Sequence, residues 1–291
     1  MLRKIIKVTL ISLLTIIIIA AVALGLFIYK VKNGFPIYES KAPVIEQQLG
    51  EKSILLFNKT NGFRHGEAIA ESKVAFAKIA SDNGWSLFET DNGAVFNDEQ
   101  LASFDLVIWS NVTGRVLKDN QRAAMKAFIE AGGGFMALHG AGDGSHPWPW
   151  YREELIGANF SHHSLKPQFQ EATMHKECAS SFPGCDAWTD PWIRTEEWYT
   201  FLDNPRDRGF QVLWTVNEAT FNPSGNLGFL VRDKNFGMGD DHPIVWYKCV
   251  GSGRSFYSAL GHAGAAFKEP AYLGLLTNAI QWAAGWEGDC P

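Results

Sequence analysis

The sequence is poor in cysteine and has no cysteine pair at the spacing typical of zinc sites. No two of its four cysteines, Cys178, Cys185, Cys249 and Cys290, are separated by two residues, so the common structural zinc motifs are excluded. None has the local setting of a nucleophile. An even number is compatible with two disulfides if the domain is exported. Cys178 and Cys185 flank a turn-rich segment and are predicted to pair. The other two then pair by elimination.

The chain also lacks the basic surface that nucleic-acid binding needs. Five of the 26 Lys and Arg residues lie in residues 1–33, together with none of the 31 Asp and Glu residues, so residues 34–291 carry a net charge of −10. Proteins bind phosphate backbones mainly through Lys and Arg. Nucleic acid is therefore not an expected partner.

A nucleotide cofactor is not expected either. The glycine-rich residues 140–144 lack the spacing of a dinucleotide-binding loop, and prolines follow them where such a loop would lead into a helix.

The sequence contains no internal repeat and no low-complexity run, which excludes repeat architectures.

One long hydrophobic run is present, and it lies at the N-terminus. Residues 8–29 carry no charge and are enough to span the apolar core of a bilayer as a helix. Three basic residues precede this run and two follow it, which favours a cytoplasmic N-terminus and an extracytoplasmic domain. Residues 1–33 are therefore predicted to be an uncleaved single-pass membrane anchor. The alternative is a secreted protein, because residues 21–23 resemble a signal-cleavage site.

Beyond the predicted linker at residues 34–50, strand and helix patterns alternate. Short apolar runs predict strands at residues 53–58, 85–90, 106–109 and 135–139. Helical periodicity predicts helices at residues 67–83, 119–131 and 270–284. Further strands are expected at residues 168–175 and 211–217, followed by a hairpin at 242–247 and 254–260. This order predicts one α/β domain over residues 51–291 with a doubly wound, mostly parallel sheet.

The best local candidate for a site is the end of the strand predicted at residues 135–139. His139 is followed by Gly140, Ala141 and Gly142, the composition of a sharp turn. In open α/β sheets, ligands bind at the carboxyl ends of the strands. The local pattern is equally compatible with a structural histidine that caps the strand.

Six motifs along the chain are rich in histidine, acidic and aromatic residues. They are residues 62–65, 134–139 with Asp143, 157–160 with His162, 196–199, 241–243 and 253–262. In this order, the motifs resemble the trehalose-utilisation (ThuA-like) family over about residues 53–286. The resemblance implies a class I glutamine-amidotransferase-like (flavodoxin-like) fold. It also implies a role in sugar metabolism, notably in the breakdown of 3-keto derivatives of disaccharides.

The chain departs from the wider fold and from the family at two places. His139 stands where glutamine amidotransferases of this fold carry a cysteine nucleophile, so glutamine hydrolysis through a thioester is excluded. The family usually has Asp-Glu-Leu-Tyr where this chain has Glu-Glu-Trp-Tyr at residues 196–199. The changes at Glu196 and Trp198 bear on the local fit of a substrate.

The resemblance and the residue types together suggest acid–base chemistry on a sugar ring. The expected catalytic residues are His139, Asp143, Glu197 and His262. The expected substrate-binding residues are Arg64, His65, Trp148, His162 and Tyr199. His162 is preferred to His163 by the family pattern, since only one of two adjacent side chains on an extended strand faces a given site. In a 3-keto glycoside the carbonyl acidifies the neighbouring C–H, so a base can remove that proton while an acid protonates the leaving oxygen.

Two alternatives remain open from the sequence. The first is a divalent metal held by His139, His162, His262 and Glu197, because three histidines and one carboxylate are an ordinary ligand set for zinc. No other cofactor is expected. The second is a non-catalytic, membrane-tethered module that binds sugar. The retention of several proton donors and acceptors favours an enzyme, most simply a glycoside hydrolase or lyase. The expected partners are a carbohydrate and the membrane.

Overall fold

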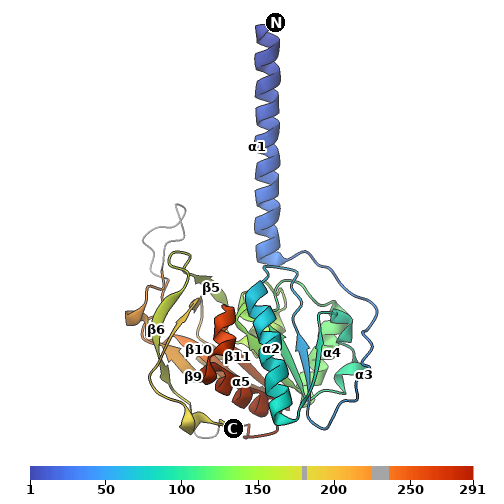
Figure 1. The fold of residues 1–291 in the computed structure, drawn as a ribbon, viewed down its shortest axis with the longest axis vertical. Helices are drawn as coiled ribbons and strands as arrows, with labels where there is room; N and C mark the ends of the chain where they lie inside the picture. The colour runs from blue at the N-terminus through green and yellow to red at the C-terminus, as the bar shows by residue number, and fades with distance from the viewer. Residues whose placement is uncertain (179–181, 225–235, 291) are drawn as a thin grey trace.

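A sheet of nine strands forms the centre of the computed structural model, which describes residues 1–178, 182–224 and 236–290 (Figure 1). The helices are α1 (Leu2–Asn33), α2 (Gly66–Asn83), α3 (Asp98–Leu101), α4 (Asp119–Glu130) and α5 (Pro270–Ala283). The strands are β1 (Ser53–Phe57), β2 (Ser86–Thr90), β3 (Leu106–Ser110), β4 (Gly134–Leu138), β5 (Phe160–His163), β6 (Gln170–Lys176), β7 (Trp192–Glu196), β8 (Tyr199–Phe201), β9 (Gln211–Val216), β10 (Pro243–Val250) and β11 (Gly253–Ser258).

The sheet is mixed, with a parallel and an antiparallel half. Its strand order is β2-β1-β3-β4-β11-β10-β9-β6-β7, and the pairs from β2 to β11 are parallel. The remaining pairs are antiparallel. β5 and β8 form a separate antiparallel pair. The doubly wound α/β fold is confirmed, and β7 and the β5–β8 pair are additions that the sequence pattern did not predict.

The core of the domain extends through both halves of the sheet, and three of the parallel strands lie entirely within it. Every residue of β1, β3 and β4 is buried, as expected for parallel strands covered on both faces. Helix α2 packs against α5, and α3 packs against α4 (Figure 1). The fully buried Trp109 of β3 contacts the rings of Phe57, Phe135 and Tyr151. Dense aromatic packing therefore supports the strands whose ends carry the candidate site residues.

Helix α1 projects away from the domain, and its apolar side chains are exposed (Figure 1). Residues Leu2–Val31 are long and apolar enough to cross a membrane, which agrees with the predicted anchor. A signal sequence near the N-terminus can meet the same criteria of length and hydropathy. The length and hydropathy of helix α1 are therefore compatible with both an uncleaved membrane anchor and a cleaved signal sequence.

Residues 34–50, predicted to be a linker, contain no helix or strand and pack against the domain. Glu39 forms an ion pair with Lys59, which is itself buried. The backbone N–H of Phe35 donates to the carbonyl of Asn61 at 3.0 Å, just beyond the carboxyl end of β1. The segment therefore connects α1 to the same edge of the sheet as the candidate site described below.

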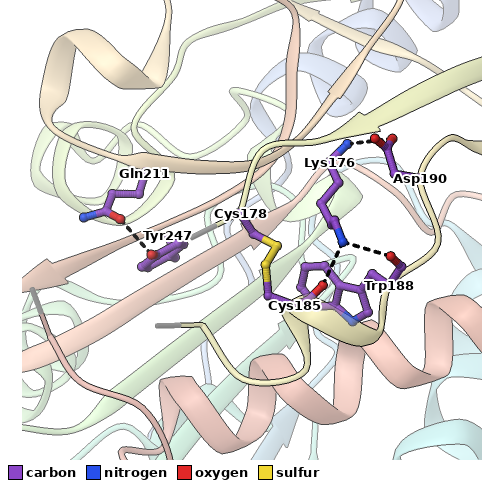
Figure 2. The surroundings of a disulfide bond; sticks show 7 residues. All are labelled: Lys176, Cys178, Cys185, Trp188, Asp190, Gln211 and Tyr247. Carbon is purple, nitrogen blue, oxygen red and sulfur yellow. Dashed lines mark hydrogen bonds between the residues drawn. A yellow bond between two sulfur atoms is a disulfide. The ribbon is translucent and has the colours of Figure 1, made fainter. Parts of the chain in front are cut away.

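Two disulfides are present, and both are the predicted pairs. They join Cys178 to Cys185 and Cys249 to Cys290, with Cα–Cα distances of 6.1 and 5.9 Å. Figure 2 shows the side chain of Lys176 beside the first disulfide, where its Nζ donates to the carbonyl of Cys185 at 3.1 Å. Residues 179–181 of the turn-rich segment lie outside the described residues. The disulfide and this hydrogen bond hold both ends of that segment against β6.

We expect the second disulfide to stabilise the domain more than the first. It joins cysteines 41 residues apart, whereas the first joins cysteines 7 apart. Because a longer closed loop restricts the unfolded chain more, replacing Cys249 and Cys290 by Ser should lower the free energy of unfolding by about 4 kcal/mol. The matched double replacement of Cys178 and Cys185 should lower it by about 2.5 kcal/mol. Denaturant unfolding of the full-length chain in detergent measures both, and the reverse order would contradict the prediction.

Candidate functional site

Four polar side chains converge at the carboxyl edge of the parallel strands. They are His65, His139, Glu197 and His262, and one potential ligand atom from each lies within 4.8 Å of the others. His65 follows β1, His139 follows β4 and His262 follows β11, so parallel neighbours deliver all three to one edge. Glu197 arrives from the turn between β7 and β8. The expectation that His139, Glu197 and His262 meet in space is confirmed.

His139 has an unusual backbone conformation at the end of β4. Its φ is +40°, in the left-handed region that a non-glycine residue adopts only at an energetic cost. Two hydrogen bonds stabilise this turn. The hydroxyl of Tyr257 donates to the carbonyl of His139 at 3.0 Å, and the next amide, of Gly140, donates to Oδ1 of Asn111 at 3.2 Å. The strained turn aims the imidazole back across the edge of the sheet.

The glycine after His139 makes room for a second imidazole. A Cβ atom on Gly140 would lie 2.8 Å from Cε1 and 2.9 Å from Nδ1 of His65. The lack of a side chain therefore lets the His65 ring pack directly on this backbone. The His65 ring is edge-on to those of His139 and His262, with centroid distances of 5.1 and 4.9 Å. The glycine-rich turn is thus a packing requirement of the three-imidazole cluster.

The hydrogen bonds of His139 determine which nitrogen faces the cluster. Its Nδ1 lies 2.7 Å from the carbonyl of Ala259, and a carbonyl can only accept, so Nδ1 carries a proton. Its Nε2 lies 3.2 Å from Oε2 of Glu197 and 2.9 Å from Nδ1 of His262. That His262 nitrogen is also 2.9 Å from the same carboxylate oxygen. Three polar atoms from three segments therefore meet at hydrogen-bonding distances.

Glu197 is a buried carboxylate with partners on both oxygens. Oε1 accepts from Nε2 of Gln168 at 2.6 Å and lies 3.1 Å from Nδ1 of His163. Burial by itself raises the pKa of a carboxyl group. Here the hydrogen bonds from His139 and His262 outweigh burial and hold the pKa of Glu197 well below its usual range. Glu197 is therefore an ionised group at neutral pH, although its side chain is only 1% exposed.

His65 is a neutral imidazole in the same cluster. It is buried, and burial together with the nearby His139 and His262 lowers its pKa to about 2. Its Nδ1 is buried and has no hydrogen-bond partner among the described residues. An unpaired nitrogen inside a protein is rare, because it has lost its hydrogen bond to water without a replacement.

The cluster is closed on one side and open on the other. The side chain of His139 is fully buried, whereas those of His262 and His163 are 15% and 25% exposed. The exposed Phe169 packs beside His262, with a distance of 5.2 Å between ring centroids. A molecule that enters from solvent therefore meets His262 and His163 before it meets Glu197 or His139.

Two positioning residues were not identified from the sequence. The buried carboxylate of Glu196 accepts from the backbone N–H groups of Gly261 at 2.9 Å and of His262 at 3.3 Å. Asn111 donates to the carbonyl of Gly261 at 3.3 Å and also supports the turn after His139. The contacts to Gly261 and His262 join segments more than 60 residues apart in sequence. Glu196 lies inside the motif at residues 196–199, and Asn111 lies two residues beyond the strand predicted at 106–109, but no pattern in the sequence indicated the partners of either residue.

A model of the trehalose-utilisation (ThuA) family matches residues 53–283. The chain belongs to the ThuA family. Its fold is similar to that of a ThuA-like protein from Bacteroides uniformis, at 23% identity and a TM-score of 0.66, with 86% of this chain and 95% of that chain covered. A ThuA-like protein from Parabacteroides merdae is similar at 17% identity and a TM-score of 0.62, with 82% and 92% covered. No curated protein matches this chain.

Within this ThuA-family domain, the placement of the paired histidines differs from the prediction. His163, not His162, lies beside Glu197. The register of β5 against β8 is irregular between Phe160 and His162, and such a bulge changes which side chains face the site. As a result, Phe160 and His163 both pack near the ring of Tyr199. His162 turns away and lies 3.1 Å from the carbonyl of Pro223, so it does not join the potential ligand set.

The other predicted residues fall into two groups. Tyr199 is buried against the cluster, with its ring 4.1 Å from that of His139. Arg64 is exposed and donates to the hydroxyl of Thr60 at 3.3 Å. The ring of Trp148 stacks with that of Tyr151, and the guanidinium of Arg122 from α4 lies over the Trp148 ring. The structure thus brings Tyr199 to the cluster and places Arg64 and Trp148 in other contacts.

Asp143 lies in the turn after His139, where its Oδ1 accepts from the backbone N–H of Ser145 at 2.8 Å. Burial raises the pKa of Asp143 to about 7, although the hydrogen bonds from Ser145 lower it. The carboxyl group of Asp143 therefore titrates near pH 7, whereas that of Glu197 is already ionised there. A group with this pKa can accept or release a proton near neutral pH.

The raised pKa of Asp143 predicts a pH-dependent stability. Because the folded value exceeds the ordinary 3.8, the folded chain holds this proton between the two values, and the protein loses stability as pH rises through that range. Asp143→Asn removes the ionisation. The free energy of unfolding of the variant minus that of wild type should therefore rise by about 2 kcal/mol between pH 5 and pH 8, because only wild type loses stability over this range. This figure allows for the partial exposure of the Asp143 side chain. Chemical unfolding at both pH values measures this, with the exposed Asp186→Asn as the matched control. An unchanged difference would contradict the assignment.

Proposed function

We propose that this protein cleaves the glycosidic bond of oxidised, 3-keto glycosides at the cluster around Glu197. Membership of a carbohydrate-related family supports the substrate class. One observation carries the chemistry: an ionised, buried carboxylate contacts three imidazoles, two of which are open to solvent. Imidazole transfers protons near neutral pH, and a carboxylate beside it stabilises the charged form that results.

The reaction requires one base and one acid on neighbouring atoms of the sugar. The carbonyl at C3 acidifies the C2–H bond, and a base removes that proton. The electron pair forms the C1–C2 double bond as the C1–O bond breaks, and an acid protonates the departing oxygen. Addition of water to the double bond completes a hydrolysis, and its omission leaves an elimination. His163 and His262 are the imidazoles that a substrate reaches, and they contact opposite oxygens of Glu197.

The buried members of the cluster have a supporting role in this proposal. His139 is fully buried and is held by the carbonyl of Ala259, so it orients Glu197 and does not reach solvent. Tyr199 packs on the His139 ring and limits its movement. Glu196 holds the backbone of His262 in place. The rigid, buried side of the cluster thereby positions the exposed side for proton transfer.

Replacement of His262 tests the proposal on the full-length chain in detergent. With 3-keto disaccharides as substrates, His262→Gln should lower kcat by about 10²- to 10⁴-fold, the usual contribution of a positioned proton donor or acceptor. Unoxidised disaccharides should not be cleaved, because they lack the acidifying carbonyl. The matched control is His175→Gln, an exposed histidine of β6 that pairs with Asp190 and should retain wild-type turnover.

Two results would refute the proposed reaction. One is full turnover by His262→Gln. The other is binding of both oxidised and unoxidised sugars by the wild-type chain without cleavage of either, which would instead support a sugar-binding module. Product analysis then separates the two reaction outcomes, because an elimination leaves an unsaturated ketone and a hydrolysis does not.

A further inference from the structure

We infer that His65, His139, Glu197 and His262 form a binding site for one divalent transition-metal ion, with zinc as the best-suited type. Each residue contributes one nitrogen or oxygen, and the four atoms lie within 4.8 Å of one another. Three imidazoles and one carboxylate, without a thiolate, are a common ligand set for zinc and related ions. The set differs from the one expected from sequence, since His65 takes the place of His162.

The distances in the cluster are close to those around a small ion. Ligand atoms about 2.0–2.2 Å from a tetrahedral zinc ion lie about 3.3–3.6 Å from one another. Nε2 of His139 is 3.2 Å from Oε2 of Glu197 and 2.9 Å from Nδ1 of His262. The third distance, from that His262 nitrogen to Oε2 of Glu197, is 2.9 Å. Outward shifts of a few tenths of an ångström would admit an ion among these three atoms, and the His65 nitrogen, which completes a set of four within 4.8 Å, would move inward to join them.

The orientation of the His139 ring also suits a cation at the centre. Nδ1 of His139 donates to the carbonyl of Ala259 at 2.7 Å, so Nε2 is the ring nitrogen directed at the cluster. This Nε2 lies 3.2 Å from Oε2 of Glu197 and 2.9 Å from Nδ1 of His262. A proton between His139 and Glu197 would join only those two groups and would leave Nδ1 of His65 without a partner among the described residues. A cation at the centre can contact all four residues.

His65 provides an independent observation that points to a ligand. The residue is 7% exposed, and its Nδ1 has no hydrogen-bond partner among the described residues. A ring nitrogen of His65 is one of the four converging atoms. Gly140 has no side chain, and a Cβ there would collide with this ring. The backbone is therefore shaped to admit an imidazole whose Nδ1 has no hydrogen-bond partner in the part of the chain that the structure describes.

The groups around the four residues are those that orient metal ligands. The His139 ring is fixed by its bond to the carbonyl of Ala259, as a ligating histidine usually is. Oε1 of Glu197 is occupied by Gln168, which leaves Oε2 as the coordinating oxygen. His163 contacts Oε1 from outside the set and would remain a free imidazole. Because His262 is the partly exposed ligand, an oxygen of a bound molecule could approach the ion from that side.

This inference stands apart from the sugar chemistry, since an ion can bind whether or not a glycoside is cleaved. If both proposals hold, a bound divalent ion would polarise a carbonyl of the substrate. His262 would then serve as a ligand, and proton transfer would fall to His163. The two proposals consequently assign different effects to different histidines, which makes their failures distinguishable.

Metal uptake by the full-length chain in detergent tests the site directly. The chain is stripped with a chelator, dialysed against zinc and analysed for metal, and one zinc ion per chain is expected. With Co²⁺ in place of zinc, we expect the intense visible absorption of a tetrahedral complex. His65→Gln should weaken zinc binding by more than about 100-fold. Replacing even a residue that only hydrogen-bonds to a metal ligand typically lowers metal affinity about 10- to 100-fold. The exposed His175→Gln is the matched control and should bind as wild type does.

Several outcomes would overturn the site. They are less than a tenth of an ion per wild-type chain, a cobalt spectrum without tetrahedral character, and undiminished uptake by a folded His65→Gln chain. The cobalt spectrum needs no variant, so the test remains decisive if His65→Gln does not fold. His163→Gln should keep the spectrum while losing turnover. One bound ion without cleavage of any 3-keto glycoside would refute the proposed reaction alone, and cleavage by a wild-type chain that takes up no metal would refute the metal site alone.

Discussion

The buried carboxylate of Glu197 is the group on which the architecture of the site depends. Its side chain is 1% exposed, yet its pKa is held well below the usual range by surrounding imidazoles. A buried charge without such partners destabilises a protein strongly, and breaking a buried pair typically costs about 3–5 kcal/mol. The fold must therefore keep His139 and His262 in place around it. This requirement explains why the positioning contacts concentrate on the turns that carry those two histidines.

Those turns contain backbone that is costly to form and is supported from several directions. His139 and Asn111 both adopt a positive φ. Asn111 forms hydrogen bonds to the turn after His139 and to the loop before His262. Glu196 binds two amides of the latter loop. Strain of this kind persists only where surrounding contacts determine the conformation, and it is concentrated at functional sites. The fully buried strands β1, β3 and β4 provide the rigid base.

Much of the fold and part of the site could be predicted from the sequence. The apolar runs that became β1, β3 and β4 are continuous because parallel strands are buried on both faces, so their pattern is strong. β7 alternates in burial and was missed, since its signal resembles that of a polar loop. His139 could be singled out because a glycine-rich turn follows a strand. The role of Glu196 could not, because its partners lie about 65 residues away and leave no local pattern.

The sequence by itself determined the α/β fold, the apolar N-terminal helix, the disulfide pairs and the convergence of His139, Glu197 and His262. Each follows from local composition, from the rule that parallel strands end at one edge, or from family motifs. Only the tertiary structure decided between His162 and His163, and only it brought His65 into the cluster. The first choice depends on an irregular register between β5 and β8. The second depends on how closely the His65 ring approaches Gly140. Both are properties of contacts between distant segments, which periodicity along one segment does not encode.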